Sequence, residues 1–380
     1  MLRVMPVFGT RPEAIKMAPL VAALLADEHI DCMVCVTGQH REMLDQVLDQ
    51  FDIKPRFDLN IMKESQTLTS ITSSVLEGMD EVIVKSKPDL ILVHGDTTTS
   101  FAAALAAFYR KIPVGHVEAG LRSFDKYSPY PEELNRTLTA KIADLNFAPT
   151  SANRKNLLRE SVPGQIFVTG NTVIDALQQM VKKDFIFSHS LLNGLSSSEK
   201  RMILLTAHRR ENLGMPMESI CRAVKRIAAD NSDVEIIYPV HRNPAVRQHV
   251  WPILSDVPNV HLIDPIEVQD MHNLINRCYL VMTDSGGLQE EAPALGKPVL
   301  VLRKETERPE ICEAGKALLV GTDENCIYEK AMKLLNDTDF YMGMRQALNP
   351  YGDGRASERI VKAIRYWAGL SAEPPIEFIV

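Results

Sequence analysis

The stretch Leu90-Ile91-Leu92-Val93-His94-Gly95-Asp96 decides the fold class of this chain. Its apolar residues predict a buried strand, and the segment Thr98–Arg110 that follows has the pattern of a helix. In an open α/β sheet, ligands bind beyond the carboxyl ends of the strands. We therefore expect Asp96 to point toward a ligand rather than into bulk solvent.

Two further carboxylates occupy similar positions. Glu118 closes the apolar run Pro113–Glu118, and Glu132 follows in Ser128-Pro129-Tyr130-Pro131-Glu132-Glu133. Carboxylates that point into a binding site suit acid/base chemistry. The sequence thus predicts Asp96, Glu118 and Glu132 as a group of proton-transferring residues.

Short apolar runs alternate with helical patterns along the chain, which is typical of parallel sheets. Strands are predicted at Val4–Phe8, Cys32–Thr37, Leu90–His94, Val114–Glu118, Leu145–Ala148, Ile166–Val168, Met202–Thr206, Glu235–Pro239, Val260–Ile263, Leu280–Thr283 and Val299–Leu302. The segment Phe185–Lys200 is rich in Ser, Asn and Gly, and it predicts a loop before the pattern restarts.

The two halves of the chain carry similar motifs. Phe8-Gly9-Thr10-Arg11 and Thr206-Ala207-His208-Arg209 each follow a first strand, and Asp96 and Asp284 each close a later one. We therefore predict two Rossmann-like, doubly wound α/β domains that face a central cleft. The N-terminal domain, residues 1–170, would carry the carboxylates, and residues 171–354 would form a nucleotide-binding domain.

Composition excludes several classes of protein. The 380 residues are 45% hydrophobic and 24% charged, with a net charge of −7, so a nucleic-acid binder with a basic stripe is not expected. No apolar run reaches the length of a membrane span, and no signal peptide is predicted, so the expected compartment is the cytoplasm. Cys32 and Cys35 lack the partners of a metal or redox site, and we expect buried thiols.

Two strand-to-helix turns have the features of anion sites. Phe8-Gly9-Thr10-Arg11-Pro12-Glu13 combines a helix start with Arg11 and Lys16, although a solvated basic residue would give the same pattern. Thr283–Glu291 places Ser285, Gly286 and Gly287 at a helix start, and Glu291 could accept both hydroxyls of a ribose. An acidic first turn that complements the helix dipole is the alternative for Glu290 or Glu291.

Other polar residues extend this set. His208 follows a strand beside two arginines and could donate to a phosphate or carry a proton. Arg308 could bind a pyrophosphate, or it could form a surface ion pair with the glutamates beside it. His94, His116 and His241 lie near strand ends, but none has metal spacing, and neither a metal nor another cofactor is expected.

These motifs together resemble one family, the non-hydrolysing UDP-N-acetylglucosamine 2-epimerases of bacteria. The matching stretches, which make the similarity run nearly end to end, are Val7–Lys16, Val93–Thr97, Gly115–Arg122, Pro131–Arg136, Thr206–Asn212 and Thr283–Gly287. The resemblance implies the glycosyltransferase-B fold, a homodimer, and a C-terminal helix, residues 355–380, that returns to the first domain. It implies UDP-N-acetylglucosamine, UDP-N-acetylmannosamine and UDP as ligands, and a product used for surface polysaccharides.

The resemblance also implies a role for each matching residue. Asp96, Glu118 and Glu132 would perform acid/base work, with Arg136 beside the sugar and Glu132. His208 and Arg11 would lie near the diphosphate. The nucleotide would be bound by Ser285, Gly286, Gly287, Glu291 and Arg308.

Bacterial members bind a second substrate nucleotide as an activator, and Gln39, His40, Glu42 and His241 match that regulatory region in part. Glu42 and Ser65 depart from the family pattern, since glutamine and arginine are expected there, and both changes disfavour a second diphosphate. Arg242 could restore a positive charge. The sequence therefore leaves regulation by substrate open, and a rate curve that added nucleotide does not change would exclude it.

The C2 hydrogen of the sugar is barely acidic, so the resemblance implies that the C1–O bond to UDP breaks first. Elimination to a 2-acetamidoglycal, followed by re-addition of UDP, would invert C2. Three alternatives remain: a glycosyltransferase of the same fold, a hydrolysing epimerase that frees N-acetylmannosamine, and a catalytically silent nucleotide-sugar sensor. The sensor has no need for Asp96, Glu118 and Glu132 together.

Overall fold

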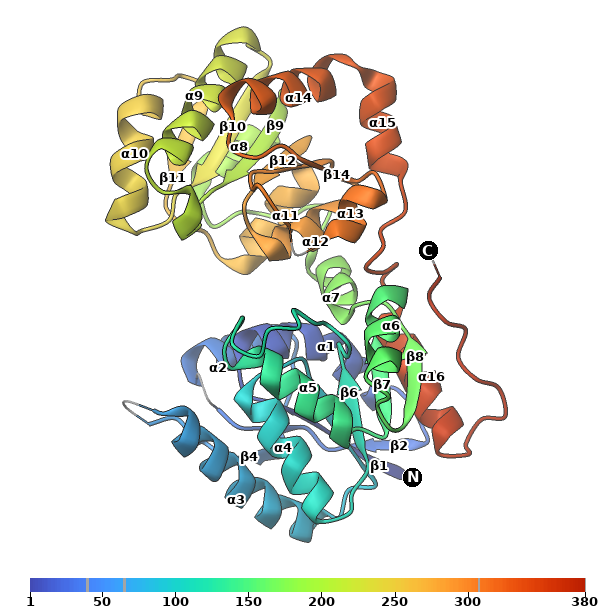
Figure 1. Ribbon diagram of the computed structural model, residues 1–380. Coiled ribbons are helices and arrows are strands. Elements are labelled where there is room, and N and C mark those ends of the chain that lie inside the picture. Colours follow the sequence, from blue (N-terminus) through green and yellow to red (C-terminus); the bar gives the residue numbers. More distant parts are fainter. Residues whose placement is uncertain (39–40, 64–65, 307, 380) are drawn as a thin grey trace. The chain divides into compact units, whose positions relative to one another are not determined.

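The computed structural model describes residues 1–38, 41–63, 66–306 and 308–379, without the side chains of residues 42 and 43. The chain forms two compact units. The first unit contains Met1–Ala176 and Tyr351–Ile379, and the second contains Leu177–Pro350. Each unit consists of helices packed on its own parallel sheet (Figure 1).

The first unit is built on a parallel sheet with the strand order β4-β3-β1-β5-β6-β7-β8, in which β2 also pairs with β1. The strands are β1 (Leu2–Phe8), β2 (Ile30–Cys32), β3 (Cys35–Val36), β4 (Phe57–Asp58), β5 (Leu90–His94), β6 (Val114–Val117), β7 (Leu145–Ala148) and β8 (Gln165–Val168). The helices are α1 (Arg11–Leu25), α2 (Arg41–Gln50), α3 (Leu68–Ser86), α4 (Thr98–Tyr109), α5 (Glu132–Ile142), α6 (Ser151–Arg159) and α16 (Ala356–Trp367), and α7 (Thr172–Met180) begins in the first unit and ends in the second.

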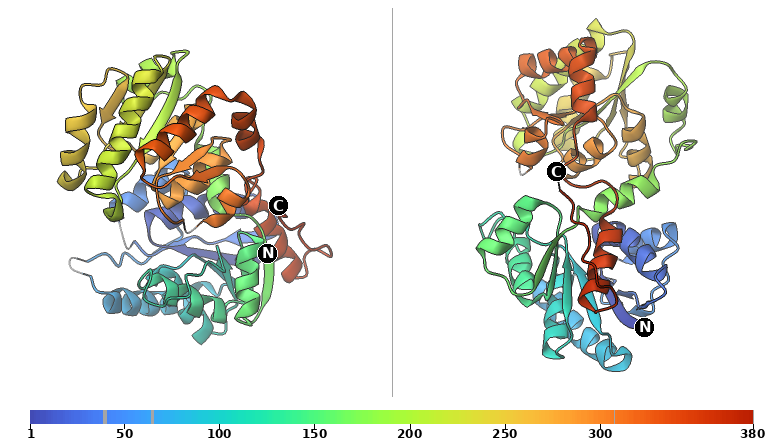
Figure 2. Two further views of the ribbon diagram at one scale, coloured as in Figure 1. Left: turned by 45° about the horizontal axis from the view of Figure 1, so that its top comes forward. Right: turned by 90° about the vertical axis from the view of Figure 1, so that its right-hand side faces the viewer.

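Both faces of this sheet are covered, which is why its central strands β1, β5 and β6 are mainly apolar. In β1, Val4 and Phe8 join the core under α1, α2 and α16, whereas Met5 and Val7 join the core under α3 and α4. This alternation follows from the two-residue repeat of a strand. The C-terminal helix α16, red in Figure 2, is thus part of the first unit and packs against α1.

The second unit is built on a parallel sheet with the order β11-β10-β9-β12-β13-β14. The strands are β9 (Arg201–Thr206), β10 (Val234–Pro239), β11 (Val260–Ile263), β12 (Leu280–Thr283), β13 (Val299–Val301) and β14 (Ala317–Leu319). The helices are α8 (Ser190–Ser196), the 3-10 helix η1 (Arg210–Asn212), α9 (Met215–Asp230), α10 (Pro244–Leu254), α11 (Val268–Arg277), α12 (Gly286–Ala294), α13 (Pro309–Glu313), α14 (Glu324–Asn336) and α15 (Thr338–Gln346).

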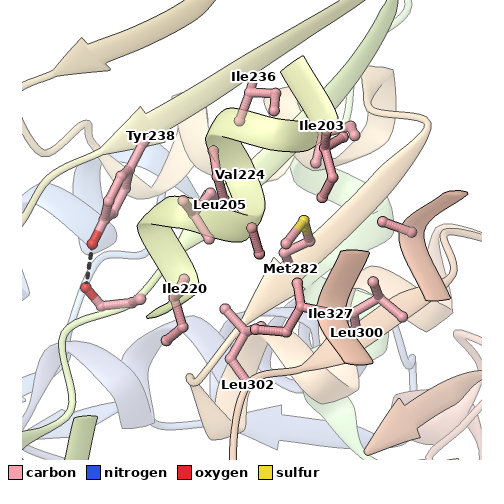
Figure 3. Close-up of a cluster of buried hydrophobic side chains, with 14 of the residues drawn as sticks. Ile203, Leu205, Ile220, Val224, Ile236, Tyr238, Met282, Leu300, Leu302 and Ile327 are labelled. Carbon is pink, nitrogen blue, oxygen red and sulfur yellow. Dashed lines mark hydrogen bonds between the residues drawn. The ribbon is translucent and has the colours of Figure 1, made fainter. Parts of the chain in front are cut away.

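Helices α9, α10 and α14 bury one face of this second sheet. Figure 3 shows Ile220 and Val224 of α9 packed on Leu205 and Met282 of the central strands. The hydroxyl of Tyr238, which is fully buried, donates a hydrogen bond to the carbonyl of Ala207. This bond anchors the segment that follows β9, where a functional turn was predicted.

The strand order reverses at the same place in both units. In the first unit, β1 lies between β3 and β5, and in the second unit β9 lies between β10 and β12. In doubly wound sheets, ligands bind at this switch point, beyond the carboxyl ends of the two central strands. The turns after β1, β5, β9 and β12 are therefore the expected ligand sites in each unit. The matching strand orders confirm the prediction of two similar parallel-sheet domains.

Two local predictions were wrong. The single strand predicted at Cys32–Thr37 is interrupted, since β2 ends at Cys32 and β3 begins at Cys35. The gap lies opposite Met5 and Pro6 of β1, and proline has no N–H to donate to a neighbouring strand. The loop predicted at Phe185–Lys200 contains the short helix α8.

Burial governs the chemistry of the cysteine pair at this interruption. It raises the pKa of both the Cys32 and the Cys35 thiol to about 12. Both side chains therefore remain protonated thiols at neutral pH. No helix among the described residues combines the length and the apolar character needed to cross a membrane.

Candidate active site

Glu118 lies at the carboxyl end of β6 in the first unit, with a side chain only 8% exposed. The Lys16 ammonium lies 2.6 Å from its Oε2, Asn171 donates its Nδ2–H to the same oxygen at 2.9 Å, and His94 Nε2 is 3.8 Å away. Burial alone would raise the pKa of Glu118, but these groups together hold the pKa at about 2. Glu118 is therefore a fixed anion.

The backbone at Glu118 is also unusual. Its φ is +62°, in the left-handed region that residues with a side chain rarely adopt. Such strain persists where the surroundings determine the position, and it concentrates at functional sites. The contacts with Lys16 and Asn171 supply that support.

Asp96 follows the neighbouring strand β5. Its carboxylate lies 2.7 Å from the Arg136 guanidinium, and the Asn135 side chain donates a hydrogen bond to its backbone carbonyl. Burial raises the pKa of Asp96 to about 6, against the opposing effect of Arg136 and with smaller contributions from Glu118 and Glu132. Asp96 can therefore gain or lose a proton near neutral pH.

Two histidines beside these carboxylates are neutral. Burial lowers the pKa of His94 to about 4 and the pKa of His116 to about 3. His116 Nε2 lies 2.7 Å from the carbonyl of Gly95, and so it anchors the turn that precedes Asp96. His116 is thus a structural residue, while His94 is part of the Glu118 environment.

Helix α5 begins at Glu132 and presents one turn of polar residues toward this site. Glu132 is half-buried, and Arg136 lies one helical turn further along the same helix. The next residue, Glu133, is buried and accepts the backbone N–H groups of Ser123 and Phe124. Glu132 is therefore available for chemistry, whereas Glu133 shapes the preceding loop.

Glu13 is a residue of the first unit that the sequence did not single out. This buried carboxylate accepts the backbone N–H groups of Gly9 and Thr10, and the hydroxyl groups of Thr97 and Ser100. It thereby ties the turn before Arg11 to the helix start after Asp96. The capping pattern Thr10-x-x-Glu13 was the available signal for its contacts with the turn before α1.

In the second unit, α12 begins immediately after Ser285, so the backbone N–H groups of Gly286 and Gly287 lie at a helix start. A Cβ added to Gly286 would lie 3.4 Å from Arg308 Nη1 and 3.7 Å from Arg209 Nη2. Two guanidinium groups and a helix N-terminus therefore converge on one point. This arrangement suits a phosphate group.

A pocket of about 280 Å³ lies beside this helix start, and the lining includes His208, His241, Ser285, Gly287 and Glu291. The imidazole rings of His208 and His241 stack with centroids 5.4 Å apart. The remaining lining is more apolar and comprises Thr206, Pro239, Pro265, Ile266, Met271 and Leu288. An apolar pocket with a few polar groups is typical of a small-ligand site.

The two glutamates of α12 have different partners. Glu291 Oε2 lies 3.2 Å from Nε2 of His272, which is buried. Glu290 pairs with Arg308, the residue immediately before α13. The alternative of an acidic first turn was wrong, because both glutamates lie beyond that turn. Arg308 does pair with a glutamate, Glu290 of α12, while its flanking residue Glu307 lies outside the described residues.

The structure describes only part of the predicted regulatory site. Gln39, His40 and Ser65 lie outside the described residues, and the side chain of Glu42 is not described. His241 lines the pocket of the second unit, beside His208. No cluster of three or more His, Cys, Asp or Glu side chains suited to a metal ion occurs in the described part of the chain.

A family model described as UDP-N-acetylglucosamine 2-epimerase matches residues 22–365. The chain belongs to the UDP-N-acetylglucosamine 2-epimerase family. The UDP-N-acetylglucosamine 2-epimerase of Bacillus subtilis is 58% identical over 378 residues, which cover 99% of this chain and 98% of that protein.

Solved structures of the epimerase family have the same fold. A crystal structure of a UDP-N-acetylglucosamine 2-epimerase is 56% identical, with a TM-score of 0.93, and covers 100% of this chain and 99% of that one. The Neisseria meningitidis UDP-GlcNAc 2-epimerase bound to UDP-GlcNAc is 47% identical, with a TM-score of 0.80, and covers 96% and 99%. The predicted glycosyltransferase-B type of architecture is thereby confirmed.

Proposed function

We propose that this chain interconverts UDP-N-acetylglucosamine and UDP-N-acetylmannosamine without hydrolysis. Membership of the epimerase family supports the reaction, and the relative bound to UDP-GlcNAc supports the ligand. The observation that carries the proposal is the pair Asp96 and Glu118, which follow neighbouring strands and have their pKa values moved in opposite directions. Such separation is typical of carboxylates with different roles in one reaction.

The chemistry requires bond rupture at C1 before proton loss at C2, because the C2 hydrogen is not adjacent to a carbonyl. As the C1–O bond breaks, its electron pair passes to the phosphate oxygen of UDP and positive charge develops at C1. The neighbouring C2–H then becomes acidic, and its loss forms the C1=C2 bond of a 2-acetamidoglycal. Addition of a proton to the other face of C2 and return of UDP to C1 complete the inversion.

The carboxylates of the first unit divide this work. A proton-transferring group is most effective when its pKa is near the working pH, so Asp96 exchanges the proton at C2. Glu118 remains ionised beside Lys16 and stabilises the positive charge at C1. Glu132 performs the second proton transfer, and Arg136 orients Asp96 through their ion pair.

The second unit stabilises the leaving group. Ser285, Gly286 and Gly287 offer a helix N-terminus to the diphosphate, and Arg308 offers a guanidinium beside it. Glu291 accepts the ribose hydroxyls, held by His272. His208 lines the same pocket and donates a proton to the departing diphosphate. Electrostatic groups of this kind supply most of the rate enhancement in many enzymes.

One experiment tests the proposal against its alternatives. The protein is incubated with UDP-N-acetylglucosamine in heavy water, and C2 of the recovered sugar is followed by NMR. Deuterium at C2 in a product still attached to UDP supports the non-hydrolysing epimerase. Protium retained at C2 would indicate a transferase or a sensor, and free deuterated N-acetylmannosamine would indicate a hydrolysing epimerase.

A further inference from the structure

Asp284, at the end of β12, is a fully buried carboxylate for which the reaction above gives no role. Its Oδ2 accepts the backbone N–H groups of His208 and Arg209, each at 2.8 Å. The same oxygen accepts Asn212 Nδ2–H at 3.0 Å. One oxygen of Asp284 therefore holds the turn that carries His208.

The other carboxylate oxygen of Asp284, Oδ1, lacks such donors within the described part of the chain. Asp284 Oδ1 is buried and has no hydrogen-bond partner among the described residues. A buried carboxylate oxygen without a donor is costly, so an approaching donor is strongly favoured. His208 Nδ1 lies 3.8 Å from this oxygen, and the His208 side chain is 42% exposed, so the ring has room to close the distance. Hydrogen bonds of catalytic groups are often long in the absence of ligand.

Three titratable groups near His208, namely Arg209, His241 and Glu291, do not take the place of Asp284. Arg209 donates its Nε–H to the backbone carbonyl of Asp284 and carries a positive charge. His241 stacks on the face of the His208 ring, where it does not reach the ring nitrogens in the ring plane. Glu291 lines the same pocket but pairs with His272.

We propose that Asp284 is the positioning residue for His208. Its Oδ1 holds the proton of the neutral imidazole on Nδ1, which leaves Nε2 as the nitrogen that exchanges a proton in the pocket. When the imidazole is protonated on both nitrogens, the same carboxylate stabilises the cation. The inference rests on the proposed function only for the identity of the proton acceptor, the departing diphosphate.

The substitution Asp284→Asn tests this geometry, because asparagine has the same shape. Its side-chain oxygen can still accept the three hydrogen bonds of Oδ2, and its amide nitrogen takes the place of Oδ1. An amide nitrogen donates, so it favours an imidazole that accepts at Nδ1. The neutral ring of His208 should therefore carry its proton on Nε2 in this variant.

The tautomer is read by NMR of protein labelled with ¹⁵N-histidine, at about pH 9, where histidine side chains are ordinarily neutral. His208→Gln identifies the resonances of His208 by their loss. We expect protonated Nδ1 in the wild type and protonated Nε2 in Asp284→Asn. As a matched control, Asn212→Ala removes one hydrogen bond to Asp284 but leaves the carboxylate, so it should keep the wild-type tautomer.

Turnover supplies a second readout. Asp284→Asn should lower kcat by about tenfold or more, while the Kd for UDP changes by less than about threefold, since the positioning of a proton donor acts on the transition state. If Asp284 acts through His208, the same substitution should have no further effect on kcat in the His208→Gln background.

Three results would overturn the assignment: an Nε2-protonated ring in the wild type, an unchanged tautomer in Asp284→Asn, or an undiminished loss of kcat in the His208→Gln background. The wild-type tautomer decides the question even if Asp284→Asn does not fold. Because the NMR readout needs no turnover, it stands whether or not the protein proves to be an epimerase.

Discussion

Asp96 shows how surroundings rather than residue type set the chemistry of a carboxylate. Burial raises its pKa from the ordinary 3.8 to about 6, so the folded chain binds this proton more tightly than the unfolded chain. Between these two pH values the folded state still holds the proton that the unfolded state has lost. Stability therefore falls as pH rises through this window, and the ionised carboxylate remains a cost above it.

The substitution Asp96→Asn removes this cost. At about pH 7 the variant should be more stable than the wild type by on the order of 2 kcal/mol, and at about pH 4 the difference should vanish. Urea unfolding at both pH values measures it. Asp89→Asn is the control, because Arg3 holds the pKa of Asp89 below its usual value, so that variant should become less stable than the wild type as pH rises. If the stability of both variants relative to the wild type changed with pH in the same direction, the raised pKa of Asp96 would be contradicted.

Gly286 leaves open the space at the start of α12 where we expect the phosphate to bind. A methyl group there would lie 3.4 Å from Arg308 Nη1, close to ordinary contact, so Gly286→Ala should fold normally. The methyl would occupy the space between the helix start and the two guanidinium groups. We expect the Kd for UDP to rise by about tenfold or more, equivalent to about 1.4 kcal/mol.

Isothermal titration with UDP measures this effect. Gly194→Ala in α8 is the matched control, since no atom lies within 4 Å of an added Cβ there. That variant should bind UDP as the wild type does. Unchanged binding by Gly286→Ala would show that phosphate does not lie at this helix start.

At the scale of the elements, several helices and several short buried strands were predicted at or close to their observed bounds, and strands β5, β7, β11 and β12 have the predicted bounds. Helices α3, α4 and α16 lie where their apolar periodicity placed them. The break between β2 and β3 was missed because it depends on Pro6 in a neighbouring strand, a partner that local sequence does not reveal. Helix α8 was missed because its seven residues give little periodicity.

Helix α16 offers a prediction at this scale. Ile364 is fully buried in the core shared with α1, so Ile364→Ala should destabilise the first unit by about 2–4 kcal/mol. Hydrogen exchange of the β1 amides reports on that unit by itself. Lys362→Ala, on the exposed face of the same helix, should change stability by less than about 0.5 kcal/mol. Similar protection of β1 in both variants would contradict the packing role of α16.

At the scale of the whole molecule, the carboxylates and the nucleotide pocket belong to different units of the chain. Glu118→Gln should therefore abolish turnover without weakening UDP binding. UDP at about 100 times its Kd should stabilise the second unit by about 2.7 kcal/mol in the wild type and in this variant alike.

Thermal unfolding with and without UDP, beside the epimerase assay, measures both properties. Arg308→Ala is the complementary variant, because it removes a guanidinium beside the helix start of α12. It should lose much of the UDP-dependent stabilisation. Wild-type turnover by Glu118→Gln, or an unchanged Kd for UDP in Arg308→Ala, would show the corresponding role to be wrong.

The amino-acid sequence by itself determined the α/β class, the strand ends and the residues that follow them, because strand and helix periodicity and glycine turns are local properties. It thereby predicted Asp96, Glu118, His208 and the turn after β12 as parts of the site. Only the tertiary structure decided which of these residues meet. The ion pair of Lys16 with Glu118, the convergence of Gly9 and Thr97 on Glu13, and the position of His208 beside Asp284 join segments far apart in sequence. Such contacts, and the burial that moves pKa values, depend on strand order, which is a property of the assembled sheet.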